Sequence, residues 1–110
     1  MTVRSKQLWN TNIAPNVFKD VCVPPAGFTA LVRTLTFYNG STAARTCYVA
    51  LFDVTNTGRY QLVYKDIPAS THVVFDSDLV VPAGLKLAVV CTGSGCNTSG
   101  HGSMLEGVAP

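Results

Sequence analysis

Turn signals recur about every ten residues along this chain, and this spacing constrains its fold more than any other feature. The signals are Pro24-Pro25-Ala26-Gly27, Asn39-Gly40, Thr55-Asn56-Thr57-Gly58, Pro68 and Pro82-Ala83-Gly84. The segments between them are short and rich in β-branched and aromatic residues, which is typical of strands. No segment carries apolar residues at the helical spacing of i, i+3, i+4 and i+7 over three turns. The pattern therefore predicts an all-β fold.

The expected strands are read from the segments that these turns separate. They cover residues 17–23, 28–38, 46–54, 60–67, 72–81, 85–92 and 103–108, and residues 3–13 add an N-terminal strand or arm. About seven to eight short strands predict a single antiparallel β-sandwich or jelly roll. We divide the chain into an N-terminal arm or edge strand, residues 1–16, and a β-sandwich domain, residues 17–110. The Gly- and Ser-rich residues 93–102 are expected to form a mobile loop.

Alternation within two of these segments predicts which side chains share a face. In the segment 85–92, one face carries Leu85, Leu87, Val89 and Cys91, and the other carries Lys86, Ala88, Val90 and Thr92. In the segment 46–54 both faces are apolar, with Cys47, Val49 and Leu51 opposed by Tyr48, Ala50, Phe52 and Val54. Such a strand is expected to be covered on both sides, and another subunit is one candidate cover. The segment 28–38 does not alternate cleanly, which predicts a β-bulge.

Charged residues are sparse and scattered. The chain has eight Lys or Arg and six Asp or Glu, a net charge of +2, and no block of like charge. Binding to a phosphate backbone needs clustered basic residues, so no nucleic-acid partner is predicted. No apolar run approaches the roughly 20 residues of a membrane helix, and residues 1–6 lack the apolar core of a signal peptide. We therefore expect no membrane partner and synthesis in the cytoplasm without a signal peptide.

Four cysteines are candidates for disulfide bonds: Cys22, Cys47, Cys91 and Cys96. The C-x4-C spacing of Cys91 and Cys96, with no second close pair and no nearby His-x3-His, argues against a zinc site. Thr92-Gly93-Ser94-Gly95 is flexible enough to let these two sulfurs meet at bonding distance. Two alternatives stay open. Cys47 and Cys91 are buried free thiols, or Cys96 pairs with another subunit while Cys91 stays buried.

Catalytic chemistry has few candidates in this sequence. Cys96 and His101 are close in sequence, but the Gly/Ser-rich segment offers nothing to hold them as a nucleophile and base. His72 begins a strand, and Asp76-Ser77-Asp78 lacks the continuation of a calcium loop. We predict no catalytic residue, no cofactor and no metal, and hence a protein that is not an enzyme.

Two further features concern surfaces. The sequons at Asn39 and Asn97 are interpreted as turn or loop residues, Asn39 because a type I′ turn needs φ > 0. Trp9 is either a plug in the core or the aromatic anchor of an arm that docks on a neighbouring subunit. Both interpretations stay open, and the interface candidates are Leu8, Trp9 and Ile13.

A Pro-Ala-Gly turn occurs twice, each time before a long apolar strand. It lies in Val23-Pro24-Pro25-Ala26-Gly27 and in Val81-Pro82-Ala83-Gly84. Between them a strand runs into Asn39-Gly40-Ser41, and the chain closes with Leu105-Glu106-Gly107-Val108. Over residues 17–108 this order resembles small β-sandwich structural proteins of tailed bacteriophage particles. The four cysteines depart from that pattern.

The resemblance implies a non-enzymatic virion protein, made in the host cytoplasm and found in the virion. Members of that class decorate capsids or contribute to necks, tails and fibres, and the resemblance does not separate these roles. Because the chain is a compact single domain without a fibre repeat, we favour a multi-copy capsid decoration protein, a homo-oligomer whose partners are the major capsid protein or neck and tail proteins. A neck, collar, tail or fibre component of the same particle is the alternative within this class. A different class also stays open, a glycan-binding β-sandwich module that would use Tyr60, Asn97 and His101.

Overall fold

The computed structural model describes residues 6–53 and 59–106, with the side chains of residues 6, 59–63 and 77 excepted. These ranges form eight strands and contain no helix, so none that could cross a membrane. The strands are β1 (Lys6–Ile13), β2 (Lys19–Cys22), β3 (Phe28–Asn39), β4 (Arg45–Asp53), β5 (Arg59–Ile67), β6 (Thr71–Pro82), β7 (Leu85–Cys91) and β8 (Cys96–Glu106). The prediction of an all-β fold is confirmed.

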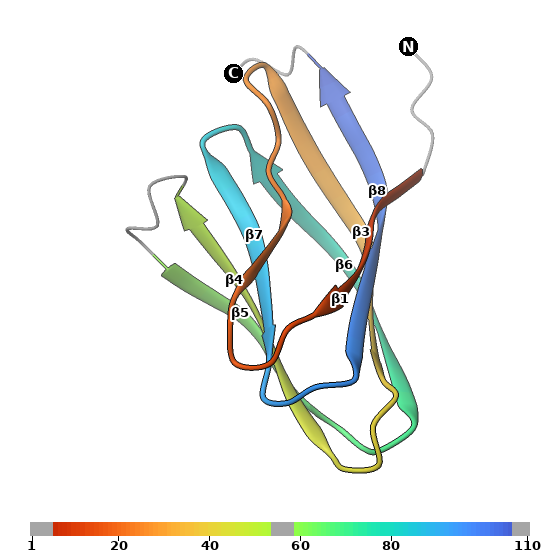
Figure 1. The fold of residues 1–110 in the computed structure, drawn as a ribbon. Helices are drawn as coiled ribbons and strands as arrows, with labels where there is room; N and C mark the ends of the chain where they lie inside the picture. The colour runs from red at the N-terminus through yellow and green to blue at the C-terminus, as the bar shows by residue number, and fades with distance from the viewer. Residues whose placement is uncertain (1–5, 54–58, 107–110) are drawn as a thin grey trace.

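The strands form two antiparallel four-stranded sheets packed face to face (Figure 1). Sheet A has the order β1-β8-β3-β6, and sheet B has the order β2-β7-β4-β5. Strand β1 pairs with β8, β2 with β7, β3 with β6 and β4 with β5. The first strand thus pairs with the last, the second with the last but one, and so on, and successive pairs lie in alternate sheets. This arrangement is the jelly roll.

The last strand begins earlier than the sequence predicts. Residues 96–102, expected in a mobile loop, are the first part of β8 and pair with both β1 and β3. Glycine is required there because the Trp9 ring lies where a Cβ of Gly100 would be, and the Leu31 carbonyl lies where a Cβ of Gly102 would be. The small residues that looked like a loop thus let a strand fit between two close neighbours.

The core lies between the sheets and follows the predicted faces. On β7 the side chains of Leu87, Val89 and Cys91 are fully buried. On β4 the side chains of Cys47 and Val49 are each no more than 1% exposed. The predicted β-bulge is present in β3, where the register shifts between Val32 and Thr34 against both neighbours.

Strand β1 is the edge of sheet A, and its apolar side chains point inward. Trp9 and Ile13 are buried at 7% and 3% exposure, and Leu8 packs partly buried against the same core. The Trp9 indole Nε1 donates a hydrogen bond to Thr98 Oγ1 at 3.3 Å. Within this chain the Trp9 ring therefore faces the core and has little surface exposed.

The two Pro-Ala-Gly turns form as expected, with Gly27 at φ +86° and Gly84 at φ +92°. Asn39-Gly40 does not form the expected type I′ turn, since neither residue is among the described residues with positive φ.

Asn39 is instead a fully buried hydrogen-bonding centre at the end of β3. Its Nδ2 donates to the carbonyls of Ala43, Ile67 and Pro68 at 2.8, 3.0 and 3.2 Å. Its Oδ1 accepts from the Ser41 amide and hydroxyl. Asn39 therefore joins the β3–β4 loop to the end of β5.

Candidate functional site

Three of the four cysteines meet at the end of the sandwich where β4 begins, β7 ends and β8 begins. Cys47 on β4 lies directly opposite Cys91 on β7. Cys96 opens β8 in the other sheet and pairs with Asn39 of β3. The topology thus brings together residues that lie 44 positions apart in the chain.

The sulfur atoms of this thiol cluster, defined as Cys47, Cys91 and Cys96, all lie within 4.8 Å of one another. Cys91 is at the centre, with its Sγ 3.4 Å from Cys47 Sγ and 2.6 Å from Cys96 Sγ. All three are free thiols, and none is more than 3% exposed.

Burial raises the pKa of two of the three thiols, Cys47 and Cys96. Desolvation, followed by the hydrogen bond that Cys47 donates to Cys91, raises the pKa of Cys47 far above its usual range. The same two causes raise the pKa of Cys96 to about 12, although the Arg45 guanidinium acts in the opposite direction. Because the thiolate is the reactive form, these thiols are poor nucleophiles at neutral pH.

The loop above the cluster is held by specific contacts. Arg45 Nε donates to the Ser94 carbonyl at 3.2 Å, and its side chain fills the space beside Gly93. The Gly40 amide donates to the Gly95 carbonyl at 2.9 Å. Gly95 has φ +91°, a conformation that favours glycine. The structure therefore gives this segment defined partners where the sequence suggested a mobile loop.

Other candidate residues are not brought together. Cys22 is buried on β2 opposite Leu87, outside the cluster, and burial raises its pKa. Cys96 is buried whereas His101, on the same strand, is exposed on the outer face. His72 and Asp76 are exposed on the edge strand β6. The described residues thus contain no Cys–His pair of the kind that the sequence left open.

The outer face of sheet B carries a group of apolar side chains, which come from several strands or their flanks. Tyr48 and Tyr64 are cross-strand partners whose rings meet edge to face at 5.0 Å. Tyr64 is 56% exposed. On the same face Ala50 and Ala88 are buried to within 1%. This aromatic face, defined as Phe18, Tyr48, Phe52, Tyr64 and Val90, was expected only in part, from the two apolar faces of the segment 46–54.

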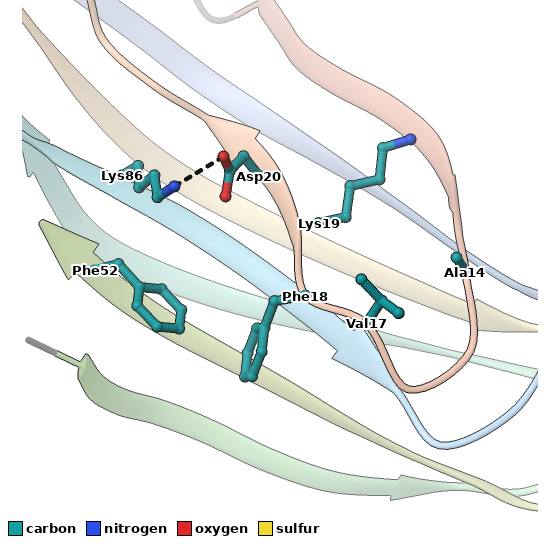
Figure 2. A pocket seen from close by; sticks show the side chains of 7 residues that line it. All are labelled: Ala14, Val17, Phe18, Lys19, Asp20, Phe52 and Lys86. Carbon is teal, nitrogen blue, oxygen red and sulfur yellow. Dashed lines mark hydrogen bonds and ion pairs between the residues drawn. The ribbon is translucent and has the colours of Figure 1, made fainter. Parts of the chain in front are cut away.

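A groove of about 650 Å³ opens at one side of the aromatic face, next to β2. Its lining residues are Ala14, Val17, Phe18, Lys19, Asp20, Phe52 and Lys86 (Figure 2). The Phe18 and Phe52 rings meet edge to face at 5.2 Å. The wall above them is an ion pair, Lys86 Nζ to Asp20 at 3.0 Å.

The ion pair neutralises the wall of the groove. The Lys86 side chain is only 10% exposed, whereas that of Asp20 is 47% exposed. Asp20 therefore presents its free edge to solvent while it satisfies a nearly buried ammonium. Apart from this pair and Lys19, the lining is apolar, from Ala14, Val17, Phe18 and Phe52.

Sheet A presents a different outer face. Its strands turn Asn, Ser, Thr and His side chains outward in rows, such as Asn97–Tyr38–His72 and His101–Thr34–Asp76. Tyr38 is 41% exposed in the first row. The side chain of Tyr60, named for glycan binding, lies outside the described residues.

No protein-family model matches this sequence, and no curated protein matches it significantly. Solved structures of viral proteins do match. A chain of the T13 infectious bursal disease virus particle aligns over 94% of this chain and 30% of its own length, with 13% identity and a TM-score of 0.54. A chain of the Gx strain of that virus aligns over 98% and 32%, with 12% identity and a TM-score of 0.54.

A pentameric capsid protein isolated from metagenomic phage sequences aligns over 94% of this chain and 64% of its own length, with 13% identity and a TM-score of 0.46. This chain spans about a third of the length of the two bursal disease virus chains. The shared feature is the fold, an antiparallel β-sandwich.

Proposed function

We propose that this chain is a non-enzymatic structural protein of a virus particle, present in several copies. Within that class we favour a capsid decoration protein of a tailed phage over a neck, collar, tail or fibre component. The jelly-roll fold and the repeated Pro-Ala-Gly turns support the class. The observation that carries the proposal is the apolar outer face of sheet B.

That face has the composition of a protein interface. Exposed aromatic residues such as Tyr64 provide large contact area at a small entropic cost, and aromatic anchors are enriched at interface centres. Phe18 and Phe52 border a groove that can take an apolar side chain from a neighbour. Val17, 61% exposed beside the groove, extends the apolar surface. We propose that a major capsid protein, or another copy of this chain, packs against it.

The first test is to purify particles from the lysate of cells that make the chain and to count its copies by quantitative mass spectrometry. We expect it to co-sediment with the major capsid protein at a fixed ratio of many copies per particle. A handful of copies per particle would favour a neck or tail position. Absence from every sedimenting particle, together with a monomeric sedimentation coefficient at high protein concentration, would overturn the proposal.

Glycan binding is a second candidate, favoured by the exposed Tyr38 between Asn97 and His72 on sheet A. An aromatic ring beside amide and imidazole groups can stack on a sugar and hydrogen-bond its hydroxyls. A glycan array with the wild-type protein and Tyr38→Ser tests it. Binding that the substitution abolishes would support this role, and no binding to any glycan would remove it.

A further inference from the structure

The thiol cluster is a candidate site of oxidation, and none of its three cysteines belongs to the proposed interface on sheet B. Cys91 ends a strand of sheet B and Cys96 begins a strand of sheet A. A covalent bond between their sulfur atoms would therefore tie the two sheets together at this end of the sandwich. The sulfur atoms are already 2.6 Å apart in the thiol form.

The geometry favours a disulfide over a metal site. Two thiolates that bind one tetrahedral zinc ion at about 2.3 Å each lie roughly 3.8 Å apart. The Cys91 and Cys96 sulfur atoms are much closer than that. Among the described residues no His, Asp or Glu joins the three thiols as a further ligand.

The third thiol gives Cys91 a second possible partner. Cys47 and Cys91 occupy a non-hydrogen-bonded position of the antiparallel pair, since the next pair outward is joined by the Thr92 amide and the Thr46 carbonyl at 3.0 Å. Side chains at such positions approach each other closely. Cys47 Sγ is nevertheless farther from Cys91 Sγ than Cys96 Sγ is, at 3.4 Å against 2.6 Å.

We infer that Cys91 and Cys96 form a disulfide between the two sheets when the protein meets a low-molecular-weight disulfide, with Cys47 as the adjacent third thiol. One cysteine thiolate attacks the small disulfide, forms a mixed disulfide and releases one small thiol. The second cysteine then attacks the mixed disulfide and releases the other small thiol. Two protein thiols are oxidised and one small disulfide is reduced, and their two protons end on the two released thiols.

Two hydrogen bonds fix the segment between Cys91 and Cys96 in the conformation that brings their sulfur atoms together. Arg45 holds the Ser94 carbonyl, and the Gly40 amide holds the Gly95 carbonyl, so the segment between the cysteines is fixed before the bond forms. Arg45 also places a positive charge near Cys96, which partly opposes the rise in the Cys96 pKa that burial causes.

The experiment exposes the reduced, purified protein to oxidised glutathione, blocks free thiols with N-ethylmaleimide in denaturant, and maps tryptic peptides without reduction. No Lys or Arg follows Lys86, so Cys91 and Cys96 fall in one peptide, residues 87–110, while Cys47 falls in residues 46–59. We expect the peptide 87–110 to be unlabelled and lighter by two hydrogen atoms, and the peptide 46–59 to carry one label. A cross-link between the two peptides would overturn the proposed pairing in favour of a bond from Cys47 to one of the two other thiols.

Four labelled cysteines after prolonged oxidation would overturn the inference altogether. Two variants test whether the bond needs any cysteine other than Cys91 and Cys96. Cys22→Ser and Cys47→Ala each leave Cys91 and Cys96 in place, so both should oxidise to the same peptide. Failure of Cys47→Ala to form this product, at an unchanged thermal midpoint, would contradict a bond that Cys91 and Cys96 form on their own.

Discussion

Sheet A and sheet B enclose the same core but turn different chemistry outward. The outer face of sheet A carries rows of Asn, Ser, Thr and His, and its exposed Val74 and Val80 are separated by Asp76 and Asp78. The outer face of sheet B carries the aromatic face and the groove beside it. An antiparallel sheet can leave one face in water when that face is polar. The polar rows of sheet A meet this condition, whereas the aromatic face of sheet B does not, and on this ground we propose that sheet B is the side covered by a partner.

The largest expected effect tests how sheet A is built. Gly102→Ala places a Cβ against the Leu31 carbonyl, so the backbone of β8 or β3 must shift. We expect a loss of about 3 kcal/mol or more in the free energy of unfolding. Gly27→Ala is the control, because it has open space and only an unfavourable φ, and should cost about 1 kcal/mol. Chemical denaturation measures both. Equal losses would mean that β8 does not pass so close to the Leu31 carbonyl.

A second prediction concerns the thiols that lie between the sheets. The pKa of Cys96 is raised to about 12, so the folded state favours the neutral thiol. The resulting stabilisation is complete below the unfolded pKa of about 8.5 and is lost as the pH rises above it toward the folded pKa. The reduced protein should therefore lose stability between about pH 8.5 and 10, measured as the urea midpoint with reductant present. Cys96→Ala should show a shallower loss over that range. An identical slope in the variant would contradict burial of the Cys96 thiol as the cause of the loss.

A third prediction compares one substitution on the two outer faces. Asp20→Asn removes the charge that pairs with the nearly buried Lys86, and we expect it to cost about 1–2 kcal/mol, since Asp20 itself is half exposed. Asp76→Asn makes the same change at an exposed position of sheet A and should stay within about 0.5 kcal/mol. Thermal denaturation at pH 7 compares them. If neither change altered the free energy of unfolding, the ion pair would contribute nothing to the stability of the groove wall.

Local patterns in the sequence predicted the strands because each depends on neighbours in the chain. Alternation gave the faces of β4 and β7, and the Pro-Ala-Gly turns gave the two positive φ angles at Gly27 and Gly84. The glycines of β8 were misread because their reason, the Trp9 ring and the Leu31 carbonyl, comes from other strands. Asn39 was misread in the same way, since its carbonyl partners in Ile67 and Pro68 lie 28 and 29 residues away.

The thiol cluster shows the same difference between features that depend on neighbours in the chain and features that depend on other strands. The closeness of Cys91 and Cys96 could be predicted, because they are only five positions apart. The addition of Cys47 could not, since it depends on the pairing of β4 with β7. One signal pointed toward it, because Cys47 and Cys91 each lie at the end of an apolar strand, on a face that carries further apolar residues.

The most direct test of the interface on sheet B uses two matched variants, Tyr64→Ser on its aromatic face and Tyr38→Ser on the outer face of sheet A. Each is titrated onto particles stripped of the protein, and binding is measured by co-sedimentation after both have been shown to unfold within about 1 kcal/mol of wild type. We predict that Tyr64→Ser weakens binding roughly tenfold or more and that Tyr38→Ser leaves it unchanged. Equal binding by the two variants, or a loss confined to Tyr38→Ser, would contradict an interface on sheet B.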